Sequence, residues 1–331
     1  MSISFSDKIK YDRLCETFSR NFKITELYAT YLERFPDIIT KELVDTLTED
    51  GVIGVKDAIS ALLCEIFGID TENSEGKILF RDYILPSIRI LDTKRYTENP
   101  YYKNVKLPDV KIGNWEFKNE IYPAYRGVIA NDMIINEDFS EIPPLGFFTE
   151  DFPFPAVLED GNEWMTLTPV DLDTSDEAIS EAHGKVVTFG LGLGYYAYMV
   201  SQKDEVESIT VVEKSEKVIE LFTKYVLPQF PNKEKIRIVN ADAFEYAECI
   251  MPTENYDVAF VDTWRDASDG APMYERMKAL EHLSSGTKFL YWIENFLKSR
   301  IRAERFAKIR DSIKSGDADM TYNEIITKII S

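Results

Sequence analysis

The sequence predicts an α/β fold in which helices flank a mostly parallel β-sheet. From residue 184 onward, short β-branched segments alternate with segments of helical length, which is typical of strand–helix–strand units with right-handed crossovers. The first expected strand, residues 185–189, runs into a turn with glycines at alternate positions, Gly190, Gly192 and Gly194. Glycine lets a backbone turn sharply and approach a ligand closely, and the free N–H groups of a following helix suit a polar or anionic ligand.

The rest of the chain is predicted in order from its periodicity and breaks. Residues 7–92 are predicted to be helical, because apolar residues recur at helical spacing on either side of a break at Pro36. Residues 93–172 are rich in tyrosine, proline and glycine, and they suit either an irregular β-rich connector or a cap over a substrate site. A helix capped by residues 174–176 is expected before the sheet, whose strands are expected at 185–189, 208–213, 236–239, 256–261 and 287–292. Residues 297–314 and 322–330 are also predicted to be helical.

These patterns predict three parts of the chain. A helical N-terminal domain is expected over residues 1–110, a β-rich connector or cap over 111–175, and a ligand-binding α/β domain over 176–331. The length of 331 residues fits two domains, with one large domain as the alternative.

The composition narrows the class of partner. The chain has 58 Asp and Glu against 38 Lys and Arg, a net charge of −20. This balance disfavours nucleic acid, which binds positive surfaces, and favours a small-molecule substrate that is cationic or amine-bearing. No stretch approaches 18 consecutive apolar residues, so no membrane segment is expected. Cys15, Cys64 and Cys249 are widely spaced, which indicates free thiols in a cytoplasmic protein and no metal site.

Polar residues follow the expected strands at their carboxyl ends, where open parallel sheets bind ligands. The second strand ends in Glu213, which can accept hydrogen bonds from both hydroxyls of a ribose, and the third is followed by Asp242, which can reach an adenine amino group. The fourth is followed by Asp262 and Trp264, and the fifth by Glu294. Each carboxylate alone is more often a helix cap or an exposed loop residue. Four polar loops in one register are harder to assign to packing.

Taken together, these segments resemble the class I S-adenosylmethionine-dependent methyltransferases, over roughly residues 184–295, and within them the spermidine-synthase-like branch. The resemblance implies a Rossmann-like fold and S-adenosylmethionine as cofactor. It assigns the glycine turn to the methionine end of the cofactor, Glu213 to the ribose, Asp242 to the adenine amine, and the two residues after Asp242 to the adenine ring. The implied cofactor contacts are Gly190, Leu191, Gly192, Gly194, Tyr195, Glu213, Lys214, Asp242, Ala243, Phe244 and Asp262. The implied catalytic residues, bordering the methyl-transfer site, are Asp262, Trp264 and Glu294.

The sequence departs from the family pattern at three places. Thr188 and its neighbours in the first strand stand where the family usually has an acid that helps to hold the methionine end. Leu193 and the run 262–266 stand where aminopropyl-transferring members carry an aspartate and an Asp-Ser-x-Asp-Pro-like run, which disfavours polyamine synthesis. No convincing strand follows residue 292, so the hairpin that usually closes the family sheet is expected to be missing.

Other functions stay open at this point. A nicotinamide dinucleotide fingerprint would need a third glycine at Tyr195 and would give no role to Asp242, so a dehydrogenase ranks below a methyltransferase. A protein that binds the cofactor without turnover, as a sensor or partner subunit, is the main alternative, and an aminopropyl or aminocarboxypropyl transferase is a third. Residues 164–168 are a candidate to fold over the cofactor, and the helical N-terminal region either caps the site or forms a homodimer contact.

Overall fold

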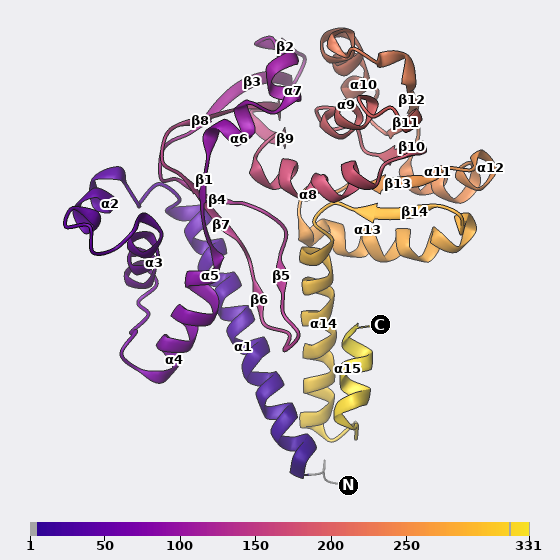
Figure 1. The fold of residues 1–331 in the computed structure, drawn as a ribbon. Coiled ribbons are helices and arrows are strands. Elements are labelled where there is room, and N and C mark those ends of the chain that lie inside the picture. The colour runs from indigo at the N-terminus through magenta and orange to yellow at the C-terminus, as the bar shows by residue number, and fades with distance from the viewer. Residues whose placement is uncertain (1–4, 318, 331) are drawn as a thin grey trace. The chain divides into compact units, whose positions relative to one another are not determined.

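The computed structural model describes residues 5–317 and 319–330, and the chain forms two compact units (Figure 1). The first unit comprises Met1–Leu91, Ala124–Thr149 and Asn295–Ser331, and the second comprises Asp92–Pro123 and Glu150–Glu294. These limits differ from the boundaries expected at residues 110 and 175. The segment 124–149 and the C-terminal helices return to the N-terminal unit, because their apolar faces are buried there rather than in the second unit.

The first unit is mostly helical, and it also contains two small sheets. In one sheet β7 is parallel to β1 and antiparallel to β4, and in the other β5 and β6 are antiparallel. The elements of this unit are α1 (Phe5–Arg34), α2 (Lys41–Thr48), α3 (Val55–Ile66), α4 (Ser74–Ile78), the π-helical η1 (Leu79–Ile84), α5 (Leu85–Ser87), β1 (Ile88–Leu91), β4 (Gly127–Ile129), β5 (Ile134–Ile135), β6 (Glu141–Ile142), β7 (Leu145–Phe148), α14 (Glu294–Ser315) and α15 (Tyr322–Ile330).

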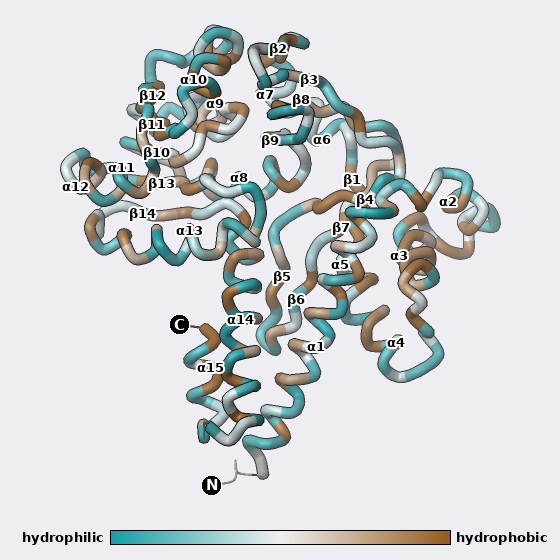
Figure 2. The backbone as a smooth tube through the Cα atoms, turned by 180° about the vertical axis from the view of Figure 1, so that it is seen from behind, coloured by the Kyte–Doolittle hydropathy of each residue, from teal (hydrophilic) through white to brown (hydrophobic). Residues whose placement is uncertain are grey.

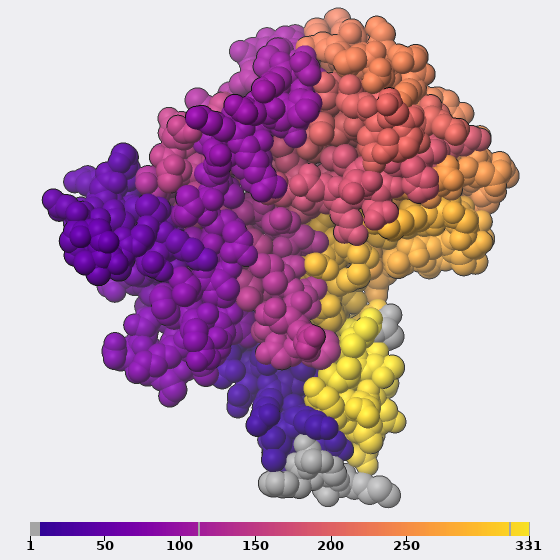
Figure 3. Space-filling view, viewed as in Figure 1, coloured from indigo at the N-terminus to yellow at the C-terminus, as the bar shows by residue number. Residues whose placement is uncertain are grey.

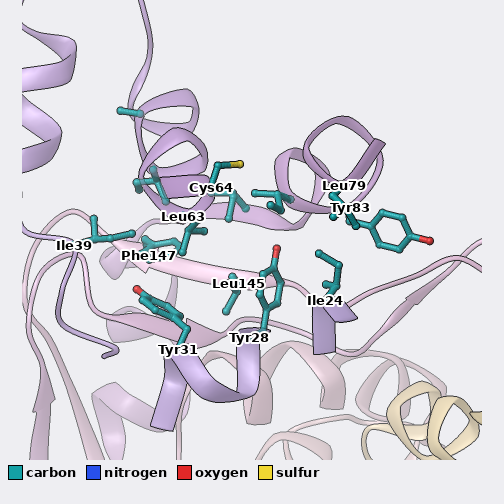
Figure 4. Close-up of a cluster of buried hydrophobic side chains, with 14 of the residues drawn as sticks. Ile24, Tyr28, Tyr31, Ile39, Leu63, Cys64, Leu79, Tyr83, Leu145 and Phe147 are labelled. Atoms are coloured by element: carbon teal, nitrogen blue, oxygen red, sulfur yellow. The ribbon is translucent and has the colours of Figure 1, made fainter. Parts of the chain in front are cut away.

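The main core of the first unit joins α1 to the β1–β7–β4 sheet (Figure 4). Ile24, Tyr28 and Tyr31 recur at helical spacing on α1 and pack with Leu145 and Phe147 of β7, and α3 adds further apolar side chains. The Tyr28 hydroxyl, which is buried, lies 2.6 Å from Ser87 Oγ and so keeps a hydrogen-bond partner. Each such side chain contributes about 1.5 to 3 kcal/mol when it is fully buried.

A second core of the first unit holds α14 and α15 against α1. Phe18 of α1 stacks on Phe306 of α14 with ring centroids 4.1 Å apart, and Ile325 and Ile329 of α15 are buried beside them. In the space-filling view α15, in yellow, lies beside the start of α1, in indigo (Figure 3). Brown and teal residues alternate along α15, as expected for a helix with one buried face (Figure 2).

The second unit contains an antiparallel sheet and a five-stranded parallel sheet. Its elements are α6 (Thr93–Thr97), α7 (Pro100–Asn104), β2 (Val110–Ile112), β3 (Trp115–Tyr122), β8 (Phe152–Glu159), β9 (Asn162–Thr166), α8 (Pro169–Glu181), β10 (Gly184–Phe189), α9 (Tyr195–Ser201), β11 (Val206–Glu213), α10 (Glu216–Leu221), the π-helical η2 (Phe222–Val226), the 3₁₀-helical η3 (Leu227–Gln229) and η4 (Lys233–Lys235), β12 (Ile236–Asn240), α11 (Ala243–Cys249), α12 (Met251–Glu254), β13 (Val258–Val261), α13 (Ala267–Leu280), the 3₁₀-helical η5 (Glu281–Ser284) and β14 (Lys288–Tyr291).

The parallel sheet confirms the predicted Rossmann-like fold class. Its strand order is β12-β11-β10-β13-β14, and every neighbouring pair is parallel. The chain moves outward in one direction from β10 to β12 and then crosses to the other side at β13, so the order reverses beside β10. Ligands bind beyond the carboxyl ends of the strands at such a reversal. Among residues 5–317 and 319–330 no strand follows β14.

The helix before β10 begins earlier than predicted. The expected cap at residues 174–176 lies inside α8, which starts at Pro169 with Thr168 as its N-cap. Pro169 supplies the fixed φ that suits a first helical position, and Asp171 accepts hydrogen bonds from Thr168 N and Oγ1, both at 2.8 Å. This capping box therefore moves the start of the helix by several residues and turns Asp171 inward.

Within the part of the chain that the structure describes, no helix has both the length and the apolar character required to cross a bilayer.

Candidate functional site

The turn after β10 requires glycine at two positions. Gly190 has a φ of +96°, and a Cβ there would overlap the carbonyl oxygen of Asp262. Gly194 has a φ of +77°, and a Cβ there would overlap the ring of Phe222. The first position brings the turn against the end of β13, and the second brings the start of α9 against η2. The first contact is with backbone and the second with a buried ring, so neither position accommodates a side chain without movement.

A large cavity opens at the carboxyl ends of β10, β11 and β12. Its volume is about 570 Å³, within the range of roughly 300 to 1,000 Å³ typical of small-molecule sites. It is lined by Trp164, Met165, Gly190, Leu191, Gly192, Val212, Glu213, Lys214, Ser215, Ala241, Asp242, Ala243, Phe244, Asp262, Thr263, Trp264, Arg265, Met273 and Arg276.

Glu213 is fixed in this cavity by the backbone around it. Its Oε2 accepts a hydrogen bond from Leu191 N at 3.1 Å, and its Oε1 accepts one from Ser215 N at 2.7 Å. A carboxylate offers about four acceptor positions, so two stay available for a ligand. The side chain thus joins the glycine turn to the end of β11 and still presents acceptors to the cavity.

Asp242 has a structural role in the same cavity. Its Oδ1 accepts from Phe244 N at 3.0 Å and Glu245 N at 3.3 Å, which caps α11, and Lys214 Nζ lies 3.3 Å from its Oδ2. Burial alone would raise the pKa of this carboxyl, but the two backbone N–H groups and Lys214 outweigh burial and lower the pKa. Asp242 is therefore an ionised, oriented acceptor.

An aromatic wall with a cation above it completes the large cavity. The guanidinium of Arg276 lies 4.0 Å from the ring centroid of Phe244, a cation–π contact. Arg276 and Met273 lie on α13 and were not predicted from the sequence.

A smaller cavity of about 150 Å³ shares part of this lining. Both cavities contact Trp164, Met165, Gly190, Leu191, Gly192, Asp262, Trp264 and Arg265, so they lie side by side. The smaller cavity is also lined by Thr166, Leu167, Asp171, Ser175, Thr188, Leu193, Tyr195, Tyr196, Ala197, Phe260 and Trp292.

Asp262 stands where the two cavities meet, and its carboxyl group has an unusual environment. Its side chain keeps some surface toward the cavities, but the protein around it removes most of its water. Burial, followed by the charges of Asp171 and Glu213, raises the pKa of Asp262 to about 8. No described residue donates a hydrogen bond to this carboxyl group. Asp262 is therefore mostly protonated at neutral pH and can exchange a proton there.

Asp171 is a second acid in the smaller cavity. Burial raises the pKa of its carboxyl group to about 6, although hydrogen bonds from Thr168 and Thr166 oppose the shift. This residue was not singled out from the sequence, because it follows no strand of the sheet. The run Thr168-Pro169-x-Asp171 was the signal that could have identified it as an oriented side chain.

Trp264 has a polar atom that the protein leaves without a partner. The residue is only 6% exposed, and its indole Nε1 has no hydrogen-bond partner among the described residues. Its ring is nearly parallel to that of Tyr291, 14° apart, with centroids separated by 6.4 Å. A buried donor without an acceptor is costly, by about 1 to 3 kcal/mol. Trp264 lines both cavities, and this cost is borne at their junction.

The structure brings most of the predicted site residues together. The cavity linings contain Gly190, Leu191, Gly192, Tyr195, Glu213, Lys214, Asp242, Ala243, Phe244, Asp262 and Trp264. Gly194 lies outside both linings and shapes the start of α9 instead. Glu294 also lies outside both, and its Oε1 accepts a hydrogen bond from the Tyr274 hydroxyl at 2.7 Å. The ligand roles of these residues stay predictions.

The donors and acceptors present fit S-adenosylmethionine. Glu213 offers acceptors suited to vicinal hydroxyls, Ala243 and Phe244 supply an apolar part of the lining, and the glycine turn lines the cavity without side chains at Gly190 and Gly192. The neighbouring cavity carries carboxylates of Asp171 and Asp262, which suit a positively charged end.

Comparison with known proteins shows distant likenesses only. The sequence matches no family model, and no curated protein matches it. Similar solved structures include a conserved hypothetical protein of Streptococcus pyogenes, with 16% identity over 32% of this chain and 65% of the other, at a TM-score of 0.26. Spermidine synthase of Thermotoga maritima is 20% identical over 46% and 59%, at a TM-score of 0.32. The methyltransferase domain of the bacterial CtHen1 is 19% identical over 36% and 60%, at a TM-score of 0.26. The aligned part thus spans less than two thirds of each of these chains, and likenesses this weak decide nothing about function.

Proposed function

We propose that this protein is an S-adenosylmethionine-dependent methyltransferase that acts on a small molecule. The observation that carries the proposal is the paired cavity at the strand reversal, in which the acceptor Glu213 faces one side and the proton-carrying Asp262 stands at the junction. The net charge of −20 supports a cationic or amine-bearing substrate rather than nucleic acid.

In this proposal the large cavity holds the nucleoside. Glu213 accepts hydrogen bonds from the ribose, Phe244 and Ala243 lie against the adenine, and Asp242 accepts from the adenine amine with the oxygen that Lys214 approaches. Trp164 and Met165 of β9 line both cavities, and they limit the access of water to the junction. When bound, the cofactor supplies a methyl group on a sulfonium, which is already activated for transfer.

The residues of the chain therefore have mainly to align the nucleophile and to manage one proton. Alignment of two reactants in a fixed geometry can contribute roughly 7 to 11 kcal/mol at best. Asp262 in its ionised form accepts the proton of an amine or hydroxyl nucleophile, and its pKa of about 8 suits that exchange near neutral pH. The rate of the chemical step should therefore rise with pH up to about 8.

A calorimetric titration with S-adenosylmethionine tests the binding half of the proposal. Glu213→Ala should weaken binding by about 1.5 to 3 kcal/mol, because a hydrogen bond to a charged group is lost. Glu207→Ala is the matched control, since Glu207 lies on the same strand but is exposed and outside both linings. Absence of binding to the unmodified protein, or equal losses in the two variants, would reject the proposal.

Turnover tests the other half and separates the alternatives. With a metabolite extract, S-adenosylhomocysteine should form with the unmodified protein and should fall at least about a hundredfold in Asp262→Ala. Binding without any product favours a sensor or partner subunit. Release of methylthioadenosine in place of S-adenosylhomocysteine favours aminopropyl or aminocarboxypropyl transfer.

A further inference from the structure

The smaller cavity contains two carboxyl groups, and no cation among the described residues pairs with them. Asp171 and Asp262 both line it, and the charge of Asp171 is among the causes of the raised pKa of Asp262, so the two groups interact. The cationic side chain in the same lining is Arg265, which is 65% exposed and lies with its Nε 3.3 Å from Asp269 Oδ2. No described residue forms an ion pair with Asp171 or Asp262.

Two interacting buried acids are unfavourable when both are ionised. The pair relieves this by retaining a proton, and a bound cation relieves it more completely because it faces both carboxylates at once. Asp171 is also positioned rather than free. Thr168 N and Oγ1 each donate to its Oδ2 at 2.8 Å, so its other oxygen is held in a fixed direction at the N-terminal turn of α8.

The rest of the lining suits an organic cation better than a metal ion. The lining is rich in aromatic residues, whose rings attract ammonium groups. They are Trp164, Tyr195, Tyr196, Phe260, Trp264 and Trp292. Among the described residues no group of three or more His, Cys, Asp and Glu side chains is arranged to hold a metal ion. The volume of about 150 Å³ fits a small alkylammonium chain rather than a large group.

We infer that Asp171 and Asp262 bind an alkylammonium group in the smaller cavity, and that Asp171 determines this specificity. Thr188 lines the same cavity from β10, and its hydroxyl lies 3.5 Å from Gly190 O. The strand thus contributes a hydroxyl to the lining, and α8 contributes the carboxylate of Asp171. The inference rests on the proposed function only for the source of the ammonium group, which is either the amino-acid end of the cofactor or an amine substrate.

The test compares Asp171→Asn with Asp176→Asn in the full-length protein. Asparagine is close in shape to aspartate and can still accept a hydrogen bond from Thr168 N, so α8 keeps its start while the charge is lost. Asp176 lies on the same helix, is exposed and lines neither cavity, so its variant is matched for charge. Calorimetry measures the binding of S-adenosylhomocysteine, which carries an ammonium group, of methylthioadenosine, which lacks one, and of n-butylamine.

The pattern of losses identifies the source. If the ammonium belongs to the cofactor, Asp171→Asn weakens S-adenosylhomocysteine about tenfold to a hundredfold and leaves methylthioadenosine unchanged. If it belongs to an amine substrate, both nucleosides bind as before, and n-butylamine binding with methylthioadenosine present is weakened by the same factor. Equal behaviour of the Asp171→Asn and Asp176→Asn proteins with all three probes overturns the inference.

The number of protons released on ammonium binding is a second measurement, and a purely structural role of Asp171 would not change it. Near pH 7 the pair retains a proton, so ammonium binding should expel up to one proton, measured as a dependence of the binding enthalpy on the buffer. In Asp171→Asn the release should be smaller, because removal of the neighbouring charge lowers the pKa of Asp262. Unchanged release also counts against the inference. A further result would separate the two proposals. If neither nucleoside binds, but n-butylamine binds to the protein alone and is weakened by Asp171→Asn and not by Asp176→Asn, the proposed function is wrong and the ammonium site is supported.

Discussion

The two cavities lie at the same edge of one sheet, yet their carboxyl groups have different hydrogen-bond partners. In the larger cavity Glu213 and Asp242 each accept hydrogen bonds from two backbone N–H groups. Those donated to Asp242 help to lower its pKa. In the smaller cavity burial raises the pKa of Asp171 to about 6 and that of Asp262 to about 8, and Asp262 accepts no hydrogen bond from a described residue.

The difference shows that the position of a carboxylate on the fold does not determine its chemistry. Residues 213, 242 and 262 all lie at or just after the carboxyl ends of strands of the parallel sheet, but only the first two accept hydrogen bonds from the N–H groups of a turn or a helix start. Hydrogen bonds from N–H donors stabilise the ionised form of a carboxyl group and fix it as an acceptor. A buried carboxyl group without such donors retains its proton to a higher pH and can exchange it. The larger cavity is thus suited to binding and orientation, and the junction with the smaller cavity to proton exchange.

The largest effect is expected where the two cavities share a wall. Gly190→Ala should lower the free energy of unfolding by roughly 3 to 5 kcal/mol, because the new Cβ meets the backbone of Asp262 and the φ of +96° is strained for alanine. Gly192→Ala is the control: its φ is +54°, and the nearest atom to a new Cβ is Met165 Sδ at 3.8 Å, so the loss should be about 1 to 2 kcal/mol. Urea denaturation measures both. Similar losses in the two variants would mean that this turn does not depend on the approach to β13.

Asp262→Asn should have the next largest effect, and its sign is opposite. The pKa of about 8 lies above the value near 3.9 of an unfolded chain, so the folded protein binds more protons between these values and its free energy of unfolding falls as the pH rises. Asp171 adds to this decrease in the free energy of unfolding only up to about pH 6, so the decrease between pH 6 and pH 8 is due to Asp262. Asparagine removes this loss, and the variant should be more stable than the unmodified protein by a few kcal/mol at pH 8.5. Denaturation at pH 5, 7 and 8.5 measures it, and parallel pH profiles of the two proteins would contradict it.

Much of the fold and of the larger cavity followed from local pattern. Alternation of β-branched and amphipathic segments predicted the sheet, and the polar residues at its strand ends, such as Glu213 and Asp242, line one cavity. These features are encoded within single strand–loop–helix segments, so the sequence displays them directly.

The remainder depends on contacts between distant segments. Asp171 reaches the smaller cavity through the inward turn at the start of α8, and Arg276 meets Phe244 across α11 and α13. Glu294 was expected near the substrate from its place after β14, yet its carboxylate accepts from the Tyr274 hydroxyl. Side-chain direction beyond a strand end is a tertiary property, and strand position alone does not predict it.

The smallest effect is expected at Asp242 and tests whether its role as a cap can be separated from its role toward a ligand. Asp242→Ala should lower the free energy of unfolding by about 1 kcal/mol, because Phe244 N and Glu245 N lose their acceptor, whereas Asp242→Asn keeps an acceptor and should change it by less than about 0.5 kcal/mol. The lowered pKa makes the contribution of the carboxylate present at neutral pH and lost as the pH falls below about 4. Urea denaturation at pH 7 and pH 3 measures both changes.

If the alanine and asparagine variants weaken the binding of S-adenosylmethionine equally while only alanine destabilises the fold, the carboxylate acts on the ligand independently of the cap. If asparagine leaves both properties unchanged, Asp242 serves α11 alone, and recognition in the larger cavity rests on Glu213 and Phe244.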